Sequence, residues 1–192
     1  HALELDDDHR VAVLHPGAVI VPAALAACEL SNASGRIFLT AVLAGYELTC
    51  RLGLAYRGSH FDHGLHPTAI FGAFGAALAA AVGMRLSADA TTNALGIVGT
   101  QACGLTEWRS DGSWIKRLHP GRAAQSGFLS ACLAEAGFTG PETIFEGPGG
   151  FFRAMGHGKI IDIDAIYANL KNRLHGLDTA LKPYPCCRFM HG

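Results

Sequence analysis

The longest apolar run of this 192-residue chain, residues 69–84, places the strongest constraint on its fold. The run is sixteen residues long and rich in alanine and glycine. A membrane-spanning helix needs about 20 mostly apolar residues, so a buried core helix over 67–83 explains the run better. Each interior glycine costs about 1 kcal/mol relative to alanine in a helix. The glycines at 72, 75 and 83 therefore indicate that another backbone approaches closely there.

Apolar residues recur at helical spacing along most of the first 137 residues. We predict further helices over 16–30, 36–56, 88–104 and 120–136, with a short one over 162–170. After residue 137, glycine and proline steps separate short segments, of which 143–145 and 177–183 favour strands. The predicted fold is mainly α, with a helical domain over 1–137. Residues 138–192 are predicted to form a linker that leads toward a different, mixed element.

Composition excludes several classes of protein. A net charge of −1 provides no basic surface for nucleic acid. The six cysteines have no zinc-ribbon spacing, which favours a reduced protein in the cytoplasm. Only 16% of the residues are charged, so we expect apolar surface that an oligomer interface or a partner domain covers. We expect neither a nucleic-acid nor a membrane partner.

Three His-Pro steps, at 15–16, 66–67 and 119–120, give the first functional signal. Proline is favoured at the first position of a helix, so each step is typical of a helix N-terminus beside an imidazole. Such termini attract anions through their unpaired N–H groups and the helix dipole. Lys116, Arg117 and Arg122 surround the third step. We therefore predict a pocket for a small polyanion, in which Lys116 also suits proton transfer.

Two other interpretations stay open. His60, His63 and His66 have a spacing that metal ligands use, which would suit a metal-dependent hydrolase. No further Cys or His pair completes a ligand set, so we expect a polar loop there and no metal or other cofactor. The chain could also be a non-catalytic, truncated helical scaffold. Three His-Pro steps could arise from capping preference alone and face different directions.

Six segments, taken together, resemble the MmgE/PrpD family of 2-methylcitrate dehydratase-like enzymes. They occur in the family's order and run nearly from end to end: 1–7, 15–18, 64–69, 111–121, 137–141 and 182–186. The resemblance implies an all-helical domain followed by a smaller α+β lid domain, so that residues 138–192 would hold the linker and the beginning of this lid. It also implies a homodimer, no cofactor, and lyase or isomerase chemistry on a small di- or tricarboxylate. Both ends of the chain look interrupted, and we expect a piece of a longer protein that turns over little by itself.

The resemblance also implies site residues at matching positions. Its catalytic set here is Glu4, His15, His66, Lys116 and Lys182. Its substrate-binding set is Asp6, Asp7, Arg117 and His119. The sequence departs from the family pattern at Glu4, where aspartate is common, and at Asp8, where threonine is common. The choice among Glu4, Asp6 and Asp7 as the acidic site residue therefore stays open.

The implied chemistry suits these residue types. Proton removal or addition at a carbon α to a carboxylate builds negative charge on a group that is already anionic. Lysines, protonated histidines and helix N-termini stabilise such charge. A histidine whose pKa lies near the working pH can exchange the proton. The sequence therefore predicts a lyase or isomerase of small polycarboxylates.

Overall fold

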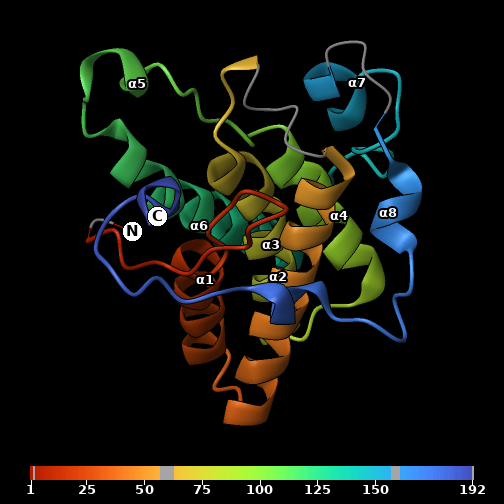
Figure 1. The fold of residues 1–192 in the computed structure, drawn as a ribbon. Helices are drawn as coiled ribbons and strands as arrows, with labels where there is room; N and C mark the ends of the chain where they lie inside the picture. The colour runs from red at the N-terminus through yellow and green to blue at the C-terminus, as the bar shows by residue number, and fades with distance from the viewer. Residues whose placement is uncertain (2, 57–62, 157–160, 192) are drawn as a thin grey trace.

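The computed structural model describes residues 1, 3–56, 63–156 and 161–191 (Figure 1). These residues form eight α-helices: α1 Gly17–Leu30, α2 Gly35–Tyr56, α3 Pro67–Gly83, α4 Ala88–Gly99, α5 Trp108–Asp111, α6 Ile115–Glu135, α7 Phe151–Gly156 and α8 Ile163–Tyr167. Two short 3-10 helices follow, η2 His175–Asp178 and η3 Arg188–Met190. Strand pairing in the described part of the chain is limited to isolated bridges. The mainly helical prediction is confirmed.

Helix α3 lies at the centre of the molecule and contacts α1, α2, α4 and α6. All of its residues are buried except Leu78 and Val82. Its small side chains let neighbouring backbones approach: a Cβ at Gly75 would lie 2.6 Å from the carbonyl oxygen of Gly45 in α2. The buried core helix predicted over Pro67–Gly83 has the predicted bounds.

Among the described residues, helix α2 is the one whose length and apolar composition would be sufficient to cross a membrane. Its buried positions include Ala41, Gly45 and Thr49, which recur every four residues along one face. That face packs against α3, which explains the apolar composition of α2 as that of a core helix.

The third His-Pro step does not open a helix, contrary to the sequence prediction. Helix α6 begins at Ile115 and continues through Pro120. The missing N–H of Pro120 leaves the carbonyl of Lys116 without its helical partner. Tertiary contacts favour helical backbone in this first turn, because Lys116 contacts Glu4 and His119 contacts His66.

Both predicted strands are also wrong. Residues 143–147 form a turn in which Gly147 N–H donates to the Thr143 carbonyl. The carbonyls of Ile144 and Phe145 accept from the start of α7, so no neighbouring strand is needed. Along 177–183, pairing is limited to one antiparallel bridge between Asp8 and Ala180. Helix α4 ends at Gly99, before the predicted residue 104.

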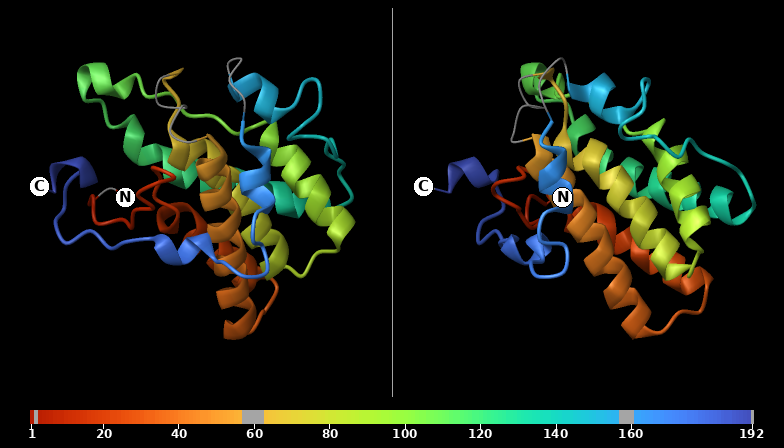
Figure 2. Two further views of the ribbon diagram at one scale, coloured as in Figure 1. Left: turned by 45° about the vertical axis from the view of Figure 1, so that its right-hand side comes forward. Right: turned by 90° about the vertical axis from the view of Figure 1, so that its right-hand side faces the viewer.

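Residues 161–191 return across α2 to the N-terminal segment, so both termini lie on the same side of the helices (Figures 1 and 2). The buried guanidinium of Arg51 holds this return path. It donates to the carbonyls of Ile166, Ala168 and Arg173 at 2.7–3.0 Å, and to Glu47. Glu47 in turn accepts from the N–H of Gly176. Arg51 thereby directs the C-terminal segment toward the region that carries the predicted site residues.

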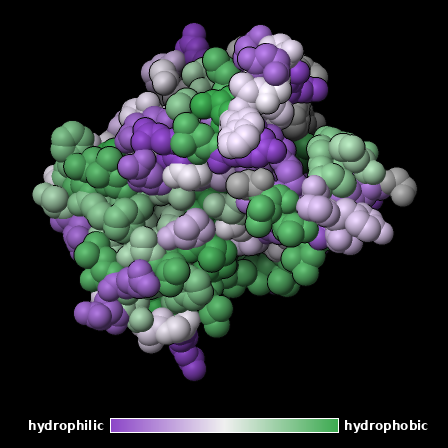
Figure 3. Space-filling model, turned by 90° about the vertical axis from the view of Figure 1, so that its left-hand side faces the viewer, coloured by the Kyte–Doolittle hydropathy of each residue, from purple (hydrophilic) through white to green (hydrophobic). Residues whose placement is uncertain are grey.

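Many large apolar side chains stay exposed on the face that carries the termini (Figure 3). Leu3, Trp114, Leu181 and Phe189 are each at least 75% exposed. Exposed apolar surface of this extent agrees with the low content of charged residues.

The close contact of α6 with α3 gives the first testable prediction. A Cβ at Gly127 would lie 2.5 Å from the backbone nitrogen of Ala77, whereas a Cβ at Gly121 meets nothing within 4 Å. We expect Gly127→Ala to lower the free energy of unfolding by about 1–3 kcal/mol, because the two helices must move apart. Gly121→Ala, in the same helix, should be neutral or stabilising by up to about 1 kcal/mol. Urea unfolding measures both, and equal effects would contradict the proposed packing.

Candidate active site

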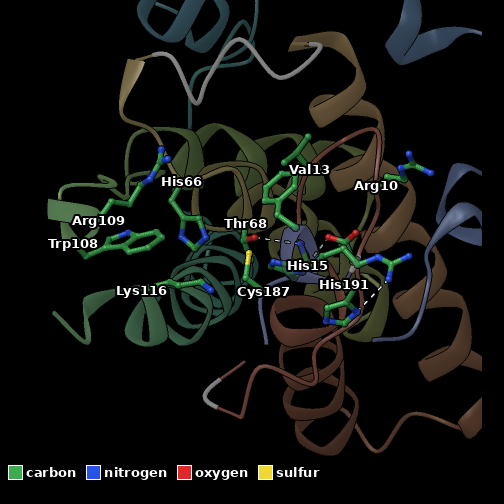
Figure 4. A pocket seen from close by; sticks show the side chains of 13 residues that line it. Arg10, Val13, His15, His66, Thr68, Trp108, Arg109, Lys116, Cys187 and His191 are labelled. Atoms are coloured by element: carbon green, nitrogen blue, oxygen red, sulfur yellow. Dashed lines mark hydrogen bonds and ion pairs between the residues drawn. The ribbon is translucent and has the colours of Figure 1, made fainter. Parts of the chain in front are cut away.

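A cavity of about 590 Å³ lies where the loop before α1, the start of α3, helices α5 and α6, and the C-terminal segment meet (Figure 4). His15, His66 and Lys116 all line it. The structure thus brings these three residues, which lie far apart in the sequence, into one cavity wall. His66 is the N-cap of α3, and His15 precedes Pro16, the N-cap of α1. Their catalytic roles stay predictions.

His15 is held by its backbone and by its ring. Its N–H donates to Thr68 Oγ1 at 3.2 Å, which ties the loop to α3. Its Nδ1 lies 2.6 Å from the carbonyl oxygen of Asp7. A carbonyl oxygen can only accept, so this contact assigns the hydrogen to Nδ1. Nε2 is therefore the ring nitrogen that can exchange a proton in the cavity. Carboxylates of Asp6 and Asp8 lie 3.4 and 3.5 Å from Nδ1.

His66 and His119 form a pair of neutral imidazoles. Burial, with smaller contributions from His119, His15 and Lys116, lowers the pKa of His66 to about 3. Burial also lowers the pKa of His119. The two Nδ1 atoms lie 2.9 Å apart, so one ring donates and the other accepts, which requires opposite tautomers. Because Nδ1 of His66 contacts His119, Nε2 of His66 is the nitrogen available to the cavity.

Lys116 is oriented by a carboxylate and an aromatic ring. Its Nζ lies 2.9 and 3.0 Å from the two carboxylate oxygens of Glu4. It also lies 5.7 Å from the centre of the Trp108 ring, which lines the cavity. An ammonium placed over an aromatic face is stabilised electrostatically. Lys116 therefore reaches the cavity as a cation whose charge Glu4 already balances.

Lys182 lies behind the cavity rather than in its wall. Its side chain is completely buried, and Nζ lies 3.1 Å from Asp6 and 3.7 Å from Glu4. Asp6 is also buried and contacts His1 Nδ1 at 2.5 Å. Glu4 and Asp6 thus join Lys116 of α6 to Lys182 of the C-terminal segment in a continuous series of ion pairs.

The remaining predicted site residues do not line the cavity either. Asp7 accepts from Gly17 N–H at the start of α1 and from the hydroxyl of Tyr46 at 2.7 Å, so its contacts are those of a structural cap. Burial raises the pKa of Asp7 despite these bonds. Arg117 lies 4.0 Å from Glu4, at the outer end of the ion-pair series. His119 supports His66 from behind.

The sequence reasoning missed the rest of the cavity lining. Besides His15, His66 and Lys116, the residues that line the cavity are Asp8, Arg10, Val13, Thr68, Trp108, Arg109, Cys187, Arg188, Phe189 and His191. Four of the lining residues are Lys or Arg and one is an acid, which favours an anionic ligand. Arg109 is close in sequence to Lys116, and that proximity was an available signal. The sequence contains no comparable signal for Arg10, Arg188 and His191, because tertiary contacts alone bring them to the cavity.

The three-histidine metal site predicted as an alternative includes one residue outside the described part of the chain. His60 lies outside the described residues, whereas His63 and His66 lie within them. In the described part of the chain, no group of three His, Cys, Asp or Glu side chains could hold a metal ion. His66 instead uses its Nδ1 to contact His119.

The fold and the cavity define a helical domain with a cation-rich, histidine-lined site, and sequence comparison identifies its family. The family model for the MmgE/PrpD N-terminal domain matches residues 1–164. This chain belongs to the MmgE/PrpD family. The resemblance that the six sequence segments indicated is confirmed.

The most informative relatives are decarboxylases. Cis-aconitate decarboxylase of Aspergillus terreus is 34% identical over 202 aligned positions, which cover all of this chain and 41% of that protein. A cis-aconitate decarboxylase-like protein of Aspergillus oryzae is 37% identical over 162 positions, covering 80% of this chain and 33% of that protein. Human cis-aconitate decarboxylase is 29% identical over 192 positions, covering 96% and 39%. The chain therefore spans about two fifths of the length of the first of these relatives. The domain boundary at residue 137 stays a prediction.

The buried ion pairs give the second testable prediction. Lys182→Met removes a completely buried cation and leaves the buried carboxylate of Asp6 with the histidines His1 and His15 as its remaining ion-pair contacts. We expect the free energy of unfolding to fall by about 3 kcal/mol or more. In the exposed pair Arg173–Asp178, by contrast, Arg173→Met should cost less than about 1 kcal/mol. Denaturant unfolding of both variants tests this, and a Lys182→Met protein as stable as the control would show that the buried pair adds nothing.

Proposed function

We propose that this chain is the helical part of a lyase that decarboxylates a small tricarboxylate of the cis-aconitate kind. One observation carries the proposal: His15, His66 and Lys116 line a single cation-rich cavity. Membership of the MmgE/PrpD family and the decarboxylase relatives support it. Dehydration and epimerisation are the alternatives within the family resemblance. No observation favours a metal-dependent hydrolase or a non-catalytic scaffold.

The proposed reaction is a decarboxylation through an allylic system, in which two electron pairs move. The bond between the CH₂ carbon and its carboxylate breaks, and that carboxylate leaves as CO₂. The electrons of the broken bond form a new terminal double bond, and the electron pair of the original double bond moves onto the far carbon. That carbon, α to a retained carboxylate, takes up one proton from the enzyme. The product is a dicarboxylate with a terminal methylene group, and the enzyme regains its proton from water.

His15 is the proposed proton donor. Its Nδ1–H is fixed on the Asp7 carbonyl, so Nε2 is the atom that can carry and deliver the proton. The bond from its backbone to Thr68 fixes the ring relative to the start of α3. A proton donor needs this fixed geometry because proton transfer requires hydrogen-bond distance in the reactive complex.

Lys116 and His66 are the proposed stabilisers of the developing charge. Negative charge spreads from the reacting carbon onto the adjacent carboxylate before the proton arrives. The Lys116 ammonium, oriented by Glu4 and Trp108, can bind that carboxylate. Neutral His66 can donate a hydrogen bond through Nε2 when its Nδ1 accepts from His119. Its low pKa keeps His66 from competing with His15 as the acid.

We also propose that the protein is a cytoplasmic homodimer. The exposed apolar side chains around Leu3, Trp114 and Leu181 would be covered by a second copy. All six cysteines are free thiols, which is usual in a reducing compartment. Light scattering of the purified protein measures the mass, and a monomer at micromolar concentration would refute the dimer.

The reaction is tested on the intact protein, with cis-aconitate in D₂O, by following CO₂ release and the deuterium content of the product. We expect one solvent deuterium at the carbon α to a retained carboxylate. His15→Gln should lower kcat by about 10²–10⁴-fold, because it removes the proton donor. His175→Gln is the matched control, since its side chain contacts Asp178 rather than the cavity.

Lys116→Met should also lower kcat, because charge stabilisation is lost at the transition state. Full activity of His15→Gln would exclude His15 as the donor. Absence of both CO₂ release and deuterium exchange, with the ligand still bound, would exclude the proposed reaction.

A further inference from the structure

The cations around the cavity differ in whether a carboxylate balances them. Lys116 is paired with Glu4, and Lys182 is paired with Asp6. Arg10 and Arg188 also line the cavity, yet neither has an ion-pair partner among the described residues. A polyanionic ligand therefore meets uncompensated positive charge at the two arginines rather than at the lysines.

These arginines belong to a part of the cavity distant from Lys116. Figure 4 shows Trp108 and Lys116 on one side of the cavity, with Arg10 and His191 on the other. Arg188 belongs to the second group, because it contacts His191. A ligand that reaches Lys116 and this group together needs anionic groups at both of its ends.

The orientation of Arg188 is set by His191. Nη1 of Arg188 lies 3.2 Å from Nδ1 of His191, and Nε2 of His191 lies 3.3 Å from the Cys186 carbonyl oxygen. The carbonyl accepts from Nε2–H, so Nδ1 carries the lone pair and accepts from the guanidinium. The Tyr184 ring packs edge-on against His191 at 5.5 Å between centres. This bond uses one of the five N–H groups of Arg188 and leaves the others for a ligand.

We propose that Arg188 binds the substrate carboxylate on the CH₂ arm, with His191 as its positioning residue and Arg10 as a weaker second cation. The proposal rests on the proposed function for the choice of ligand. A guanidinium presents parallel N–H donors that match the two oxygens of a carboxylate. Arg10 is exposed, so solvent screens its charge more strongly than that of half-buried Arg188. Arg188 is therefore the residue that selects tricarboxylates over dicarboxylates.

The test compares two ligands that differ by one carboxylate. Cis-aconitate has three carboxylates, whereas methylmaleate has the same carbon–carbon double bond with a methyl group in place of the CH₂-carboxylate arm. Calorimetry gives Kd for both ligands without any need for turnover. We expect Arg188→Met to weaken cis-aconitate about 10- to 100-fold and methylmaleate less than about threefold, so the preference for cis-aconitate falls.

Arg188→Lys keeps the charge but loses the paired donors, so it should retain part of the preference and show that loss of folding is not the cause. His191→Phe should reduce the preference to an intermediate extent and raise KM more than it lowers kcat, because Arg188 is then less well oriented. Arg122→Met is the matched control, since Arg122 contacts Gln125 on the exposed surface of α6. It should leave both Kd values unchanged.

Each outcome separates this subsite from the proposed reaction. An unchanged preference in Arg188→Met, or an equal loss for both ligands, overturns the subsite even when CO₂ release continues. A lost preference without any CO₂ release in the unaltered protein supports the subsite and overturns the reaction. Failure of the unaltered protein to bind either ligand overturns the subsite.

Discussion

The close packing of backbones around α3 is the constraint on which the rest of the structure depends. Alanine and glycine along this helix allow α1, α2 and α6 to approach it, because larger side chains would hold the helices apart. The N-terminus of α3 then lies where α6 and the loop before α1 meet. His66 occupies the N-cap position of that terminus, so the packing of the core fixes one wall of the cavity.

Buried ion pairs complete the site that this packing begins. Glu4 and Asp6 bring Lys116 and Lys182 together from α6 and the C-terminal segment. Burying these charges requires that each has a partner, since an unpaired buried charge is costly. The same pairing balances the charge of both lysines. The uncompensated guanidinium of Arg188 and that of Arg10 remain on the side of the cavity away from Lys116, where the anionic ligand supplies the missing charge.

Local sequence signals succeeded where short-range physics decides the structure. The predicted bounds of α3 match the observed ones. Ser87, a residue type favoured at helix starts, caps α4 through a bond from Ala90 N–H. They failed where distant contacts override local preference. Pro120 lies inside α6 because Lys116 and His119 make tertiary contacts in the preceding turn, although proline is favoured at a helix start. Residues 143–145, despite their strand-like composition, turn to pack their apolar side chains on the helices.

The sequence by itself determined the helical class, the buried helix α3, and the histidines and lysine that meet in one cavity. These follow from hydrophobic periodicity, from the space that small residues allow, and from the resemblance of six ordered segments to one family. Only the tertiary structure decided that Lys182 is buried against Asp6, that Asp7 caps α1, and that Arg188 reaches the cavity. Charge pairing between segments more than 170 residues apart has no local pattern in the sequence, because it depends on where Arg51 directs the returning chain.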